Sequence, residues 1–318
     1  MTVKVSRGAV GEFEAIVLEN LYLRAVIIPE LGGRVWELED RTRGRQWIWH
    51  REDVPLKASP LGAVYDDVWA GGWEELFPND APGRFENRDL PDHGEWWTMR
   101  WAVAESSCDS TANVCLSATS TVVKASCTKE FRLAHDAATL SVCYRIRSDE
   151  LQPYHFLFKQ HLPIHLTPDC RLALPGGKVL AVDPSFGNIL PEDGPYDWPF
   201  AGRGDNVIDM RVVPHRSSRM REFLYVRDLP QPWCGVEDTR NSASIRMDFD
   251  SREVPFVWLF LSYGGWRNVY TAVLEPCSNM PKDLSKAVRL GQSARLEPGQ
   301  EFKTTVSVTL TDLEKTTR

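Results

Sequence analysis

Apolar and polar positions alternate with a period of two in many short segments of this chain. These segments are rich in Val, Ile, Thr, Tyr and Cys and are separated by Gly, Pro, Asn or Asp; examples are 15–18, 21–28, 113–118 and 139–146. Side chains two apart share one face of a strand, so the pattern is typical of β-strands with one buried face. Sustained helical periodicity is nearly absent, and 282–290 predicts a short helix. We therefore expect an all-β sandwich or barrel with few short helices.

Two apolar runs with strand composition, 254–263 and 268–277, lie close together near the C-terminus, and a last strand is expected over 304–310. The second run contains Glu275, which is followed directly by Pro276. Proline cannot donate a ladder hydrogen bond, so we expect strand pairing to stop there and to leave the carboxylate at a rim or cleft. An ordinary strand-end glutamate facing solvent is the alternative.

Composition and length limit the possible classes of protein. The chain has 318 residues, 42% hydrophobic and 25% charged, with a formal net charge of −7. All-β domains can be long, so we expect one domain over residues 1–318. The negative charge argues against nucleic acid or an anionic membrane as a partner, and no apolar run approaches the roughly 20 residues of a membrane span. The N-terminal segment has no hydrophobic signal core, so we expect a cytoplasmic protein.

The seven cysteines are scattered and form no Cys-x-x-Cys pair, which gives no support to a zinc or redox motif. No Gly-rich phosphate loop or Gly-x-Ser-x-Gly elbow is present. We therefore expect no metal and no cofactor. The twelve tryptophans are the unusual count. Indole faces suit the C–H faces of sugar rings, although a large aromatic β core would use them as well.

A Trp-rich block covers 69–80 and 90–97 and is dense in acidic residues. It supplies flat apolar faces together with polar groups, which would suit a sugar pocket. The candidate sugar-binding residues here are Trp73, Glu75, Asn79 and His93. His93 lies between Asp92 and Gly94, where the alternative is a histidine that only shapes a turn.

The segment 154–166 places several basic side chains at one strand parity. His155, Lys159, His161 and His165 share a face if this is a strand, although Pro163 is expected to end or bend it. The opposite face is mostly apolar and is expected to be core. The polar row either lines a cleft or is a solvated face, and its spacing does not fit a helical His-x-x-x-His zinc site.

Arg34 follows Gly32 and Gly33, which permit a tight turn or a close backbone approach. Its guanidinium could bind sugar oxygens, or it could be a solvated arginine after a hairpin turn. A pair of carboxylates for glycoside hydrolysis also stays open at this point.

Taken together, these short motifs resemble the galactose mutarotase-like superfamily, the aldose 1-epimerases and their relatives, over roughly residues 10–310. The motifs that carry the resemblance are Pro29-Glu-Leu-Gly-Gly-Arg-Val, Gly71-Gly-Trp-Glu-Glu-Leu-Phe-Pro-Asn, Asp92-His-Gly-Glu, Phe158-Lys-Gln-His, Leu274-Glu-Pro-Cys and Leu296-Glu-Pro-Gly. The resemblance implies a large antiparallel β-supersandwich with a sugar cleft across one sheet. It implies Glu275 as general base, His161 as general acid and His93 as a sugar contact, with His155 and His165 as rivals for the acid.

The resemblance also implies a function, an aldose 1-epimerase that interconverts sugar anomers, with a non-catalytic carbohydrate-binding protein as the alternative. The expected partner is a small sugar, with or without an acidic substituent, bound by a monomer or homodimer. The residues expected to bind it are Arg34, Trp73, Glu75, Asn79, Lys159 and His165. Several relatives carry an arginine close to the segment that leads into the Phe-Pro, where this chain has Ala70 and two glycines. Either Arg34 takes that role, or the substrate differs from a plain hexose.

Overall fold

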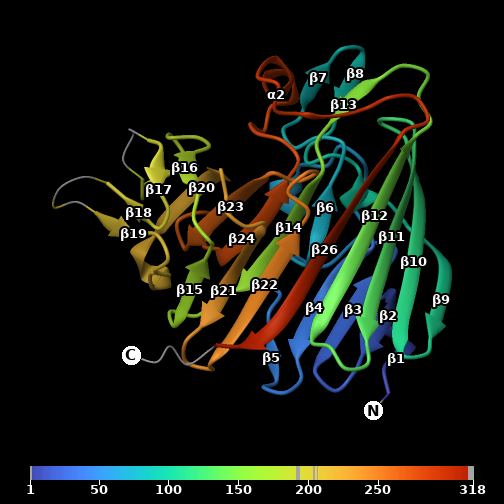
Figure 1. The fold of residues 1–318 in the computed structure, drawn as a ribbon, viewed down its shortest axis with the longest axis horizontal. Coiled ribbons are helices and arrows are strands. Elements are labelled where there is room, and N and C mark those ends of the chain that lie inside the picture. Colours follow the sequence, from blue (N-terminus) through green and yellow to red (C-terminus); the bar gives the residue numbers. More distant parts are fainter. Residues whose placement is uncertain (1, 191–193, 203–204, 206, 314–318) are drawn as a thin grey trace.

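The computed structural model describes residues 2–190, 194–202, 205 and 207–313. Three large antiparallel sheets make up most of this part of the chain (Figure 1). The first contains, in order, β1 (Lys4–Val10), β2 (Phe13–Glu19), β3 (Leu23–Ile28), β4 (Arg34–Asp40) and β5 (Arg45–Gln46). The second contains β15 (Cys170–Ala173), β21 (Trp233–Asp238), β22 (Ala243–Phe249), β26 (Glu301–Asp312), β12 (Thr139–Ser148), β11 (Ala125–Ala134), β10 (Thr111–Ser120) and β9 (Ala102–Cys108). The third contains β17 (Tyr196–Asp197), β16 (Lys178–Ala181), β20 (Met220–Arg227), β23 (Phe256–Tyr263), β24 (Tyr270–Cys277), β14 (Lys159–His165) and β6 (Glu74–Leu76).

Small elements cover the ends of these sheets. Three two-stranded sheets are formed by β13 (Tyr154–Phe156) with β25 (Ala294–Leu296), β18 (Phe200–Ala201) with β19 (Ile208–Asp209), and β7 (Gly83–Phe85) with β8 (Arg88–Leu90). The helices are α1 (Tyr65–Val68), α2 (Leu284–Arg289) and two 3-10 turns, η1 (Trp96–Thr98) and η2 (Arg216–Ser218). No helix in the described part of the chain has the length and apolar character needed to cross a membrane.

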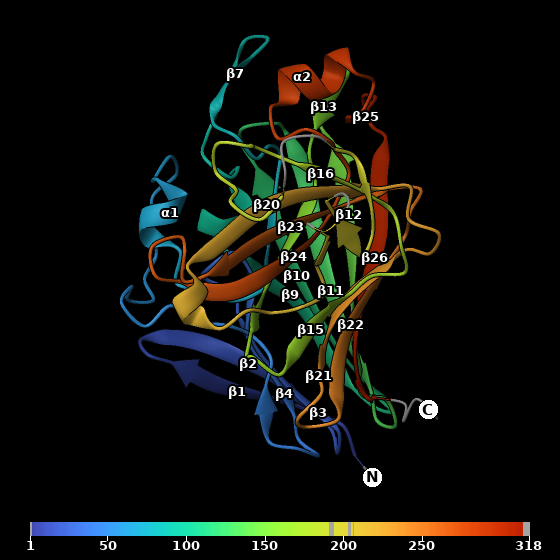
Figure 2. The same ribbon diagram turned by 90° about the vertical axis from the view of Figure 1, so that its left-hand side faces the viewer.

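The eight-stranded and seven-stranded sheets pack face to face, and the view from the side shows the layers (Figure 2). Strand alternation explains the core between them. In β23, Val257, Leu259 and Leu261 point into it, whereas Trp258 and Phe260 point to the outer face of the sheet. Each fully buried aliphatic side chain of this kind contributes roughly 1.5–3 kcal/mol. The all-β class and the sandwich that the sequence predicted are confirmed, and α2 forms inside the predicted 282–290 segment.

The two prolines expected to end strands do not end them. Pro276 is paired with Val257 inside β24, which continues to Cys277 with a neighbour on each side, so Glu275 lies within a central strand rather than at a strand end. Pro163 lies within β14, beyond the stretch that pairs with β6, and its carbonyl accepts the Trp49 N–H at 3.0 Å. A proline removes only one donor, and the paired strands on either side hold the rest of the ladder.

Candidate active site

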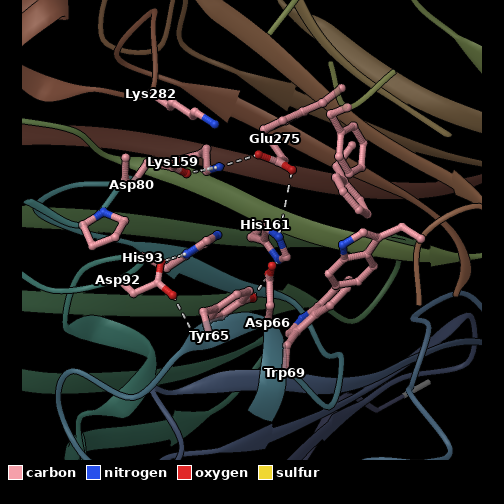
Figure 3. A pocket seen from close by; sticks show the side chains of 16 residues that line it. Tyr65, Asp66, Trp69, Asp80, Asp92, His93, Lys159, His161, Glu275 and Lys282 are labelled. Carbon is pink, nitrogen blue, oxygen red and sulfur yellow. Dashed lines mark hydrogen bonds and ion pairs between the residues drawn. The ribbon is translucent and has the colours of Figure 1, made fainter. Parts of the chain in front are cut away.

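A cavity of about 310 Å³ opens on the outer face of the seven-stranded sheet (Figure 3). Its floor comes from β14, β20, β23 and β24, whose outward positions carry polar or aromatic side chains in place of core residues. One wall comes from residues 65–93, and Phe186, Trp266 and Lys282 complete the lining. Because neighbouring strands fix the floor, the groups that project from it have well-defined positions.

The centre of the floor holds an acid–base pair. The register of β14 against β24 pairs Leu162 with Leu274 and so sets His161 across from Glu275. The His161 Nε2 and Glu275 Oε1 atoms are 3.9 Å apart. Both side chains are buried, with relative exposures of 5% for His161 and 1% for Glu275. A separation of this size leaves the two groups able to act on neighbouring atoms of one ligand.

Lys159 is the cation beside this pair. Its Nζ lies 2.5 Å from Glu275 Oε2 and 2.5 Å from Asp80 Oδ2, as the dashed lines in Figure 3 show. The ammonium also lies 4.3 Å from the centre of the Trp258 ring. Burial opposes the charge, but the two carboxylates outweigh it and raise the pKa of Lys159. Lys159 therefore anchors one oxygen of Glu275 and leaves the other facing His161.

Burial changes the proton affinities of the pair in opposite directions. It raises the pKa of Glu275, against the effect of the Lys159 ammonium. It lowers the pKa of His161 to well below the usual value, and the charge of Lys159 adds to that effect. The carboxyl becomes a weaker acid and the imidazolium a stronger one, so burial favours a proton on Glu275 over one on His161 more than in the free side chains.

A line of hydrogen-bonded polar side chains leads from His161 Nδ1 to Arg34 in β4. The Tyr65 hydroxyl donates to Glu74 Oε1 and lies 3.2 Å from His161 Nδ1. The other oxygen of Glu74 accepts from Arg34, whose guanidinium also donates to the Gly71 carbonyl at 2.8 Å. Burial raises the pKa of Glu74, and Arg34 opposes this rise by favouring the carboxylate. Both ends of this line are fixed by strands.

His93 projects from the wall formed by the Trp-rich block. Its Nδ1 lies 2.7 Å from Asp92 Oδ1, and its ring stacks on Tyr65 with a centroid distance of 4.0 Å. Burial opposes the imidazolium, but the Asp92 and Asp80 carboxylates together outweigh it and raise the pKa of His93. The next residue is Gly94, where a Cβ would lie 2.3 Å from the Phe77 carbonyl oxygen, so only glycine allows this close turn.

Aromatic rings cover the opposite side of the cavity. The Trp69 ring meets the His161 ring edge-on at 5.1 Å and lies 6.4 Å from Trp266. Phe260 meets Trp266 edge-on at 5.3 Å. The cavity therefore has a charged half and an aromatic half, an arrangement that suits a ligand with both hydroxyl groups and apolar C–H faces. Within the described residues, no group of three or more His, Cys, Asp or Glu side chains is placed to hold a metal ion.

The structure brings four of the predicted site residues together. Glu275, His161, His93 and Lys159 all line the cavity. Their roles in catalysis or sugar binding remain predictions. The resemblance placed them in one site although they lie far apart in the sequence.

Five other predicted site residues do not line this cavity. Arg34 is one layer behind it, paired with Glu74. Trp73 and Glu75 point to the core face of β6, because Glu74 and Leu76 occupy its outer face. Both side chains therefore lie on the side of β6 that faces away from the cavity.

Asn79 and His165 are also directed elsewhere. The Asn79 amide donates to the Ala81 carbonyl at 3.1 Å and to the Pro91 carbonyl, at 2.6 Å, and so it shapes the loop. His165 is exposed at the far end of β14. His155, considered as a rival acid, lies in β13 with its Nδ1 2.8 Å from Ser293 Oγ.

Sequence reasoning missed Tyr65, Asp80, Trp266 and Lys282 as lining residues. Tyr65 begins the short helix α1, and Lys282 lies just before α2. Segments this short have no periodicity that predicts where a side chain points. Glu74 could have been found, because Trp73 and Phe77 share a parity that predicts the core face and so directs Glu74 outward.

No family model matches the chain. Its fold is similar to several solved structures over nearly its whole length. A "putative aldose 1-epimerase" from Klebsiella pneumoniae has a TM-score of 0.74 at 12% identity, covering 98% of this chain and 84% of that one. A galactose mutarotase-like protein from Clostridium acetobutylicum has a TM-score of 0.68 at 13% identity, covering 98% and 99%. A "putative aldose 1-epimerase" from Escherichia coli has a TM-score of 0.67 at 16% identity, covering 93% and 98%.

These similarities define the class of structure. The chain has the galactose mutarotase-like fold, the antiparallel supersandwich that the sequence motifs predicted. At identities of 12–16%, the likeness is one of fold. Fold alone does not determine activity, which depends on the groups of the site.

Proposed function

We propose that this protein is an isomerase of the aldose 1-epimerase type, which interconverts the α and β anomers of a sugar. The observation that carries the proposal is the placement of Glu275 and His161. They face each other across neighbouring strands, 3.9 Å apart, in the floor of a cavity with charged and aromatic walls. The names of the proteins with similar folds agree with this function.

Anomer exchange is a proton-transfer reaction. A proton leaves the anomeric hydroxyl, another reaches the ring oxygen, and the bond between C1 and the ring oxygen breaks to give an open-chain carbonyl. Rotation about the C1–C2 bond and closure on the other face of the carbonyl give the other anomer. In each half of the cycle the sugar loses one proton and gains one. The base that gains a proton on opening returns it on closure, so the protein regains its starting state.

In this proposal Glu275 is the base and His161 the acid for ring opening. The pair needs to carry one proton, and that proton changes owner when the ring opens, so each residue takes the opposite role during closure. The pKa shifts of the two groups favour proton gain by Glu275 and proton loss by His161, which are the directions of transfer during ring opening. His93, in contact with the Asp92 carboxylate at 2.7 Å, is placed to orient a sugar hydroxyl, and Trp69 and Trp266 offer faces for the ring.

Anomer exchange measured by NMR or polarimetry tests this proposal on a panel of neutral and acidic aldoses. Glu275→Gln and His161→Asn are expected to lower the catalysed rate by about 10²–10⁴-fold, the usual contribution of general acid–base groups. His165→Asn is the matched control, because it changes the same residue type on the same strand outside the cavity and should keep the wild-type rate. Wild-type rates in Glu275→Gln would refute the assignment.

Carbohydrate binding without catalysis is a second candidate, and one contact favours it. Glu275 Oε2 is already in contact with an ammonium at 2.5 Å, which would suit a fixed acceptor as well as a base. A binding protein would bind sugar without accelerating anomer exchange over buffer, and tryptophan fluorescence, to which Trp69 and Trp266 in the cavity contribute, measures the binding. An acceleration that depends on Glu275 would rule this candidate out.

A further inference from the structure

Four buried side chains from four separate elements lie in a line that ends at the cavity. Arg34 comes from β4, Glu74 from β6, Tyr65 from α1 and His161 from β14. Arg34 contacts Glu74, Glu74 contacts the Tyr65 hydroxyl, and that hydroxyl lies 3.2 Å from His161 Nδ1. Three of these residues lie outside the acid–base pair, yet they connect directly to one of its members.

The hydrogen-bond directions along this line follow from the number of protons available. Tyr65 has one hydroxyl proton, and it is donated to Glu74, which already accepts from Arg34 through its other oxygen. Toward His161 the Tyr65 oxygen can therefore only accept, so His161 Nδ1 must carry the proton. The remaining nitrogen, Nε2, is the one that faces Glu275 and the cavity.

Packing alone does not explain such a line. Burying a guanidinium and a carboxylate together often contributes nothing net to stability, because desolvation offsets their attraction. Tyr65 already has apolar contacts that fill the space: its ring stacks on His93 at 4.0 Å and meets Trp97 edge-on at 5.1 Å. The Tyr65 hydroxyl, held by Glu74 and Arg34, also determines which ring nitrogen of His161 carries the proton. A histidine that reacts through only one ring nitrogen needs its proton fixed in this way.

We propose that Tyr65 is a positioning residue that fixes the ring tautomer of His161, with Glu74 and Arg34 holding the Tyr65 hydroxyl in place. Nδ1 keeps its proton throughout, and Nε2 is the atom that gives and takes the proton exchanged with the sugar. This inference rests on the proposed anomer exchange for its catalytic meaning. The tautomer itself is a property of the free protein.

Charges surround His161 on several sides. Glu275 faces Nε2 at 3.9 Å, and the charges of Lys159, His93 and Arg34 all disfavour a second proton on the ring. Without the Tyr65 hydroxyl, the Glu275 carboxylate would draw the single proton of a neutral ring to Nε2. That tautomer leaves no lone pair at Nε2, so the ring could not take a proton from the sugar there.

The substitution Tyr65→Phe tests the inference, because it removes the hydroxyl and keeps the ring that stacks on His93. In ¹⁵N NMR spectra of the protein labelled at histidine, the neutral ring of wild-type His161 is expected to show the Nδ1–H tautomer, and that of Tyr65→Phe a large fraction of Nε2–H. The kcat of anomer exchange should fall about 10²-fold with little change in KM, since the hydroxyl that is removed already contacts Glu74 and His161 and the lining ring is kept. An unchanged tautomer in Tyr65→Phe would overturn the proposal.

Two further variants separate positioning from stability. Tyr144→Phe removes another buried hydroxyl that donates to a glutamate, at 2.5 Å, and should leave the His161 tautomer and kcat unchanged. Glu74→Gln keeps an acceptor for Tyr65 and should reduce kcat less than Tyr65→Phe does. If the wild type shows no anomer exchange with any sugar, the proposed function fails, and the NMR spectra alone decide whether Tyr65 sets the tautomer.

Discussion

Consecutive glutamates in β6 form two buried clusters on opposite faces of one strand, and the clusters have the same chemical parts. On the cavity side Glu74 contacts Arg34 and the Tyr65 hydroxyl. On the core side Glu75 contacts the Lys129 ammonium and the Tyr144 hydroxyl. Each cluster combines one carboxylate, one cation and one phenol in a place that water scarcely reaches.

The difference lies in where each cluster ends. The core cluster is closed: Lys129 also donates to the Gly32 carbonyl at 2.6 Å and lies 4.5 Å from the centre of the Trp101 ring. Because Lys129 and Tyr144 belong to the eight-stranded sheet, this cluster joins the two layers of the sandwich. The cavity cluster ends instead at the ring nitrogen of His161. Burial and ion pairing alone therefore do not indicate a catalytic role, whereas connection to a reactive group does.

Of the substitutions that compare the two clusters, Lys129→Met is expected to change the free energy of unfolding most. It leaves the Glu75 carboxylate without its cation in the core, so the free energy of unfolding should fall by about 3–5 kcal/mol. Urea unfolding followed by tryptophan fluorescence measures the change. Anomer exchange per folded molecule should stay at the wild-type rate, measured well below the unfolding transition. Loss of kcat in fully folded Lys129→Met would show that the two clusters are not independent.

Tyr144→Phe should have a smaller effect on the same quantity. It removes one donor to Glu75 and keeps the ring, so the free energy of unfolding should fall by about 1–3 kcal/mol. Tyr65→Phe should cost a similar amount of stability, and the two variants should differ chiefly in kcat. A comparable fall in kcat for both would remove the distinction between the clusters.

The smallest expected effect is the pH dependence of the Asp92–His93 contact. The pKa of His93 is raised in the folded protein. Its stabilising effect is therefore fully present below the pKa of the unfolded state and is lost as pH rises through the folded value. Asp92→Asn should remove about 0.5–1.5 kcal/mol on the acid side of neutrality, where Asp92 is still ionised, and less at alkaline pH. Unfolding measured across this range checks the sign, and an equal loss at both ends would contradict it.

The period-2 pattern predicted the strands well, because alternation needs only local sequence. It also placed Leu162 and Ile164 correctly in the core, opposite Lys159 and His161. Glu75, which we expected to bind sugar, lies on the core face of β6, because neighbouring residues of a strand point to opposite faces.

The rest of the site depends on long-range packing that the local pattern does not contain. Asp80 reaches Lys159 from an irregular loop, and Tyr65 reaches His161 from a single helical turn. Pro276 failed as a stop signal because β24 has neighbours on both sides that continue the ladder past it. The assembled fold determines where loop side chains point. It also determines whether a sheet can continue past a residue that lacks a hydrogen-bond donor.

The two adjacent glutamates of β6 also bear on how the chain finds its alignment during folding. A strand shifted by one position would bring only one of the two glutamates to a cation and a phenol, and the other would lie at the place of Trp73 or Leu76. Pairing of both carboxylates therefore favours the native alignment. Size favours the same alignment, because Trp73 donates to Gln160 in the core at 2.7 Å and a Cβ at Gly72 would lie 2.5 Å from Arg34 Cδ.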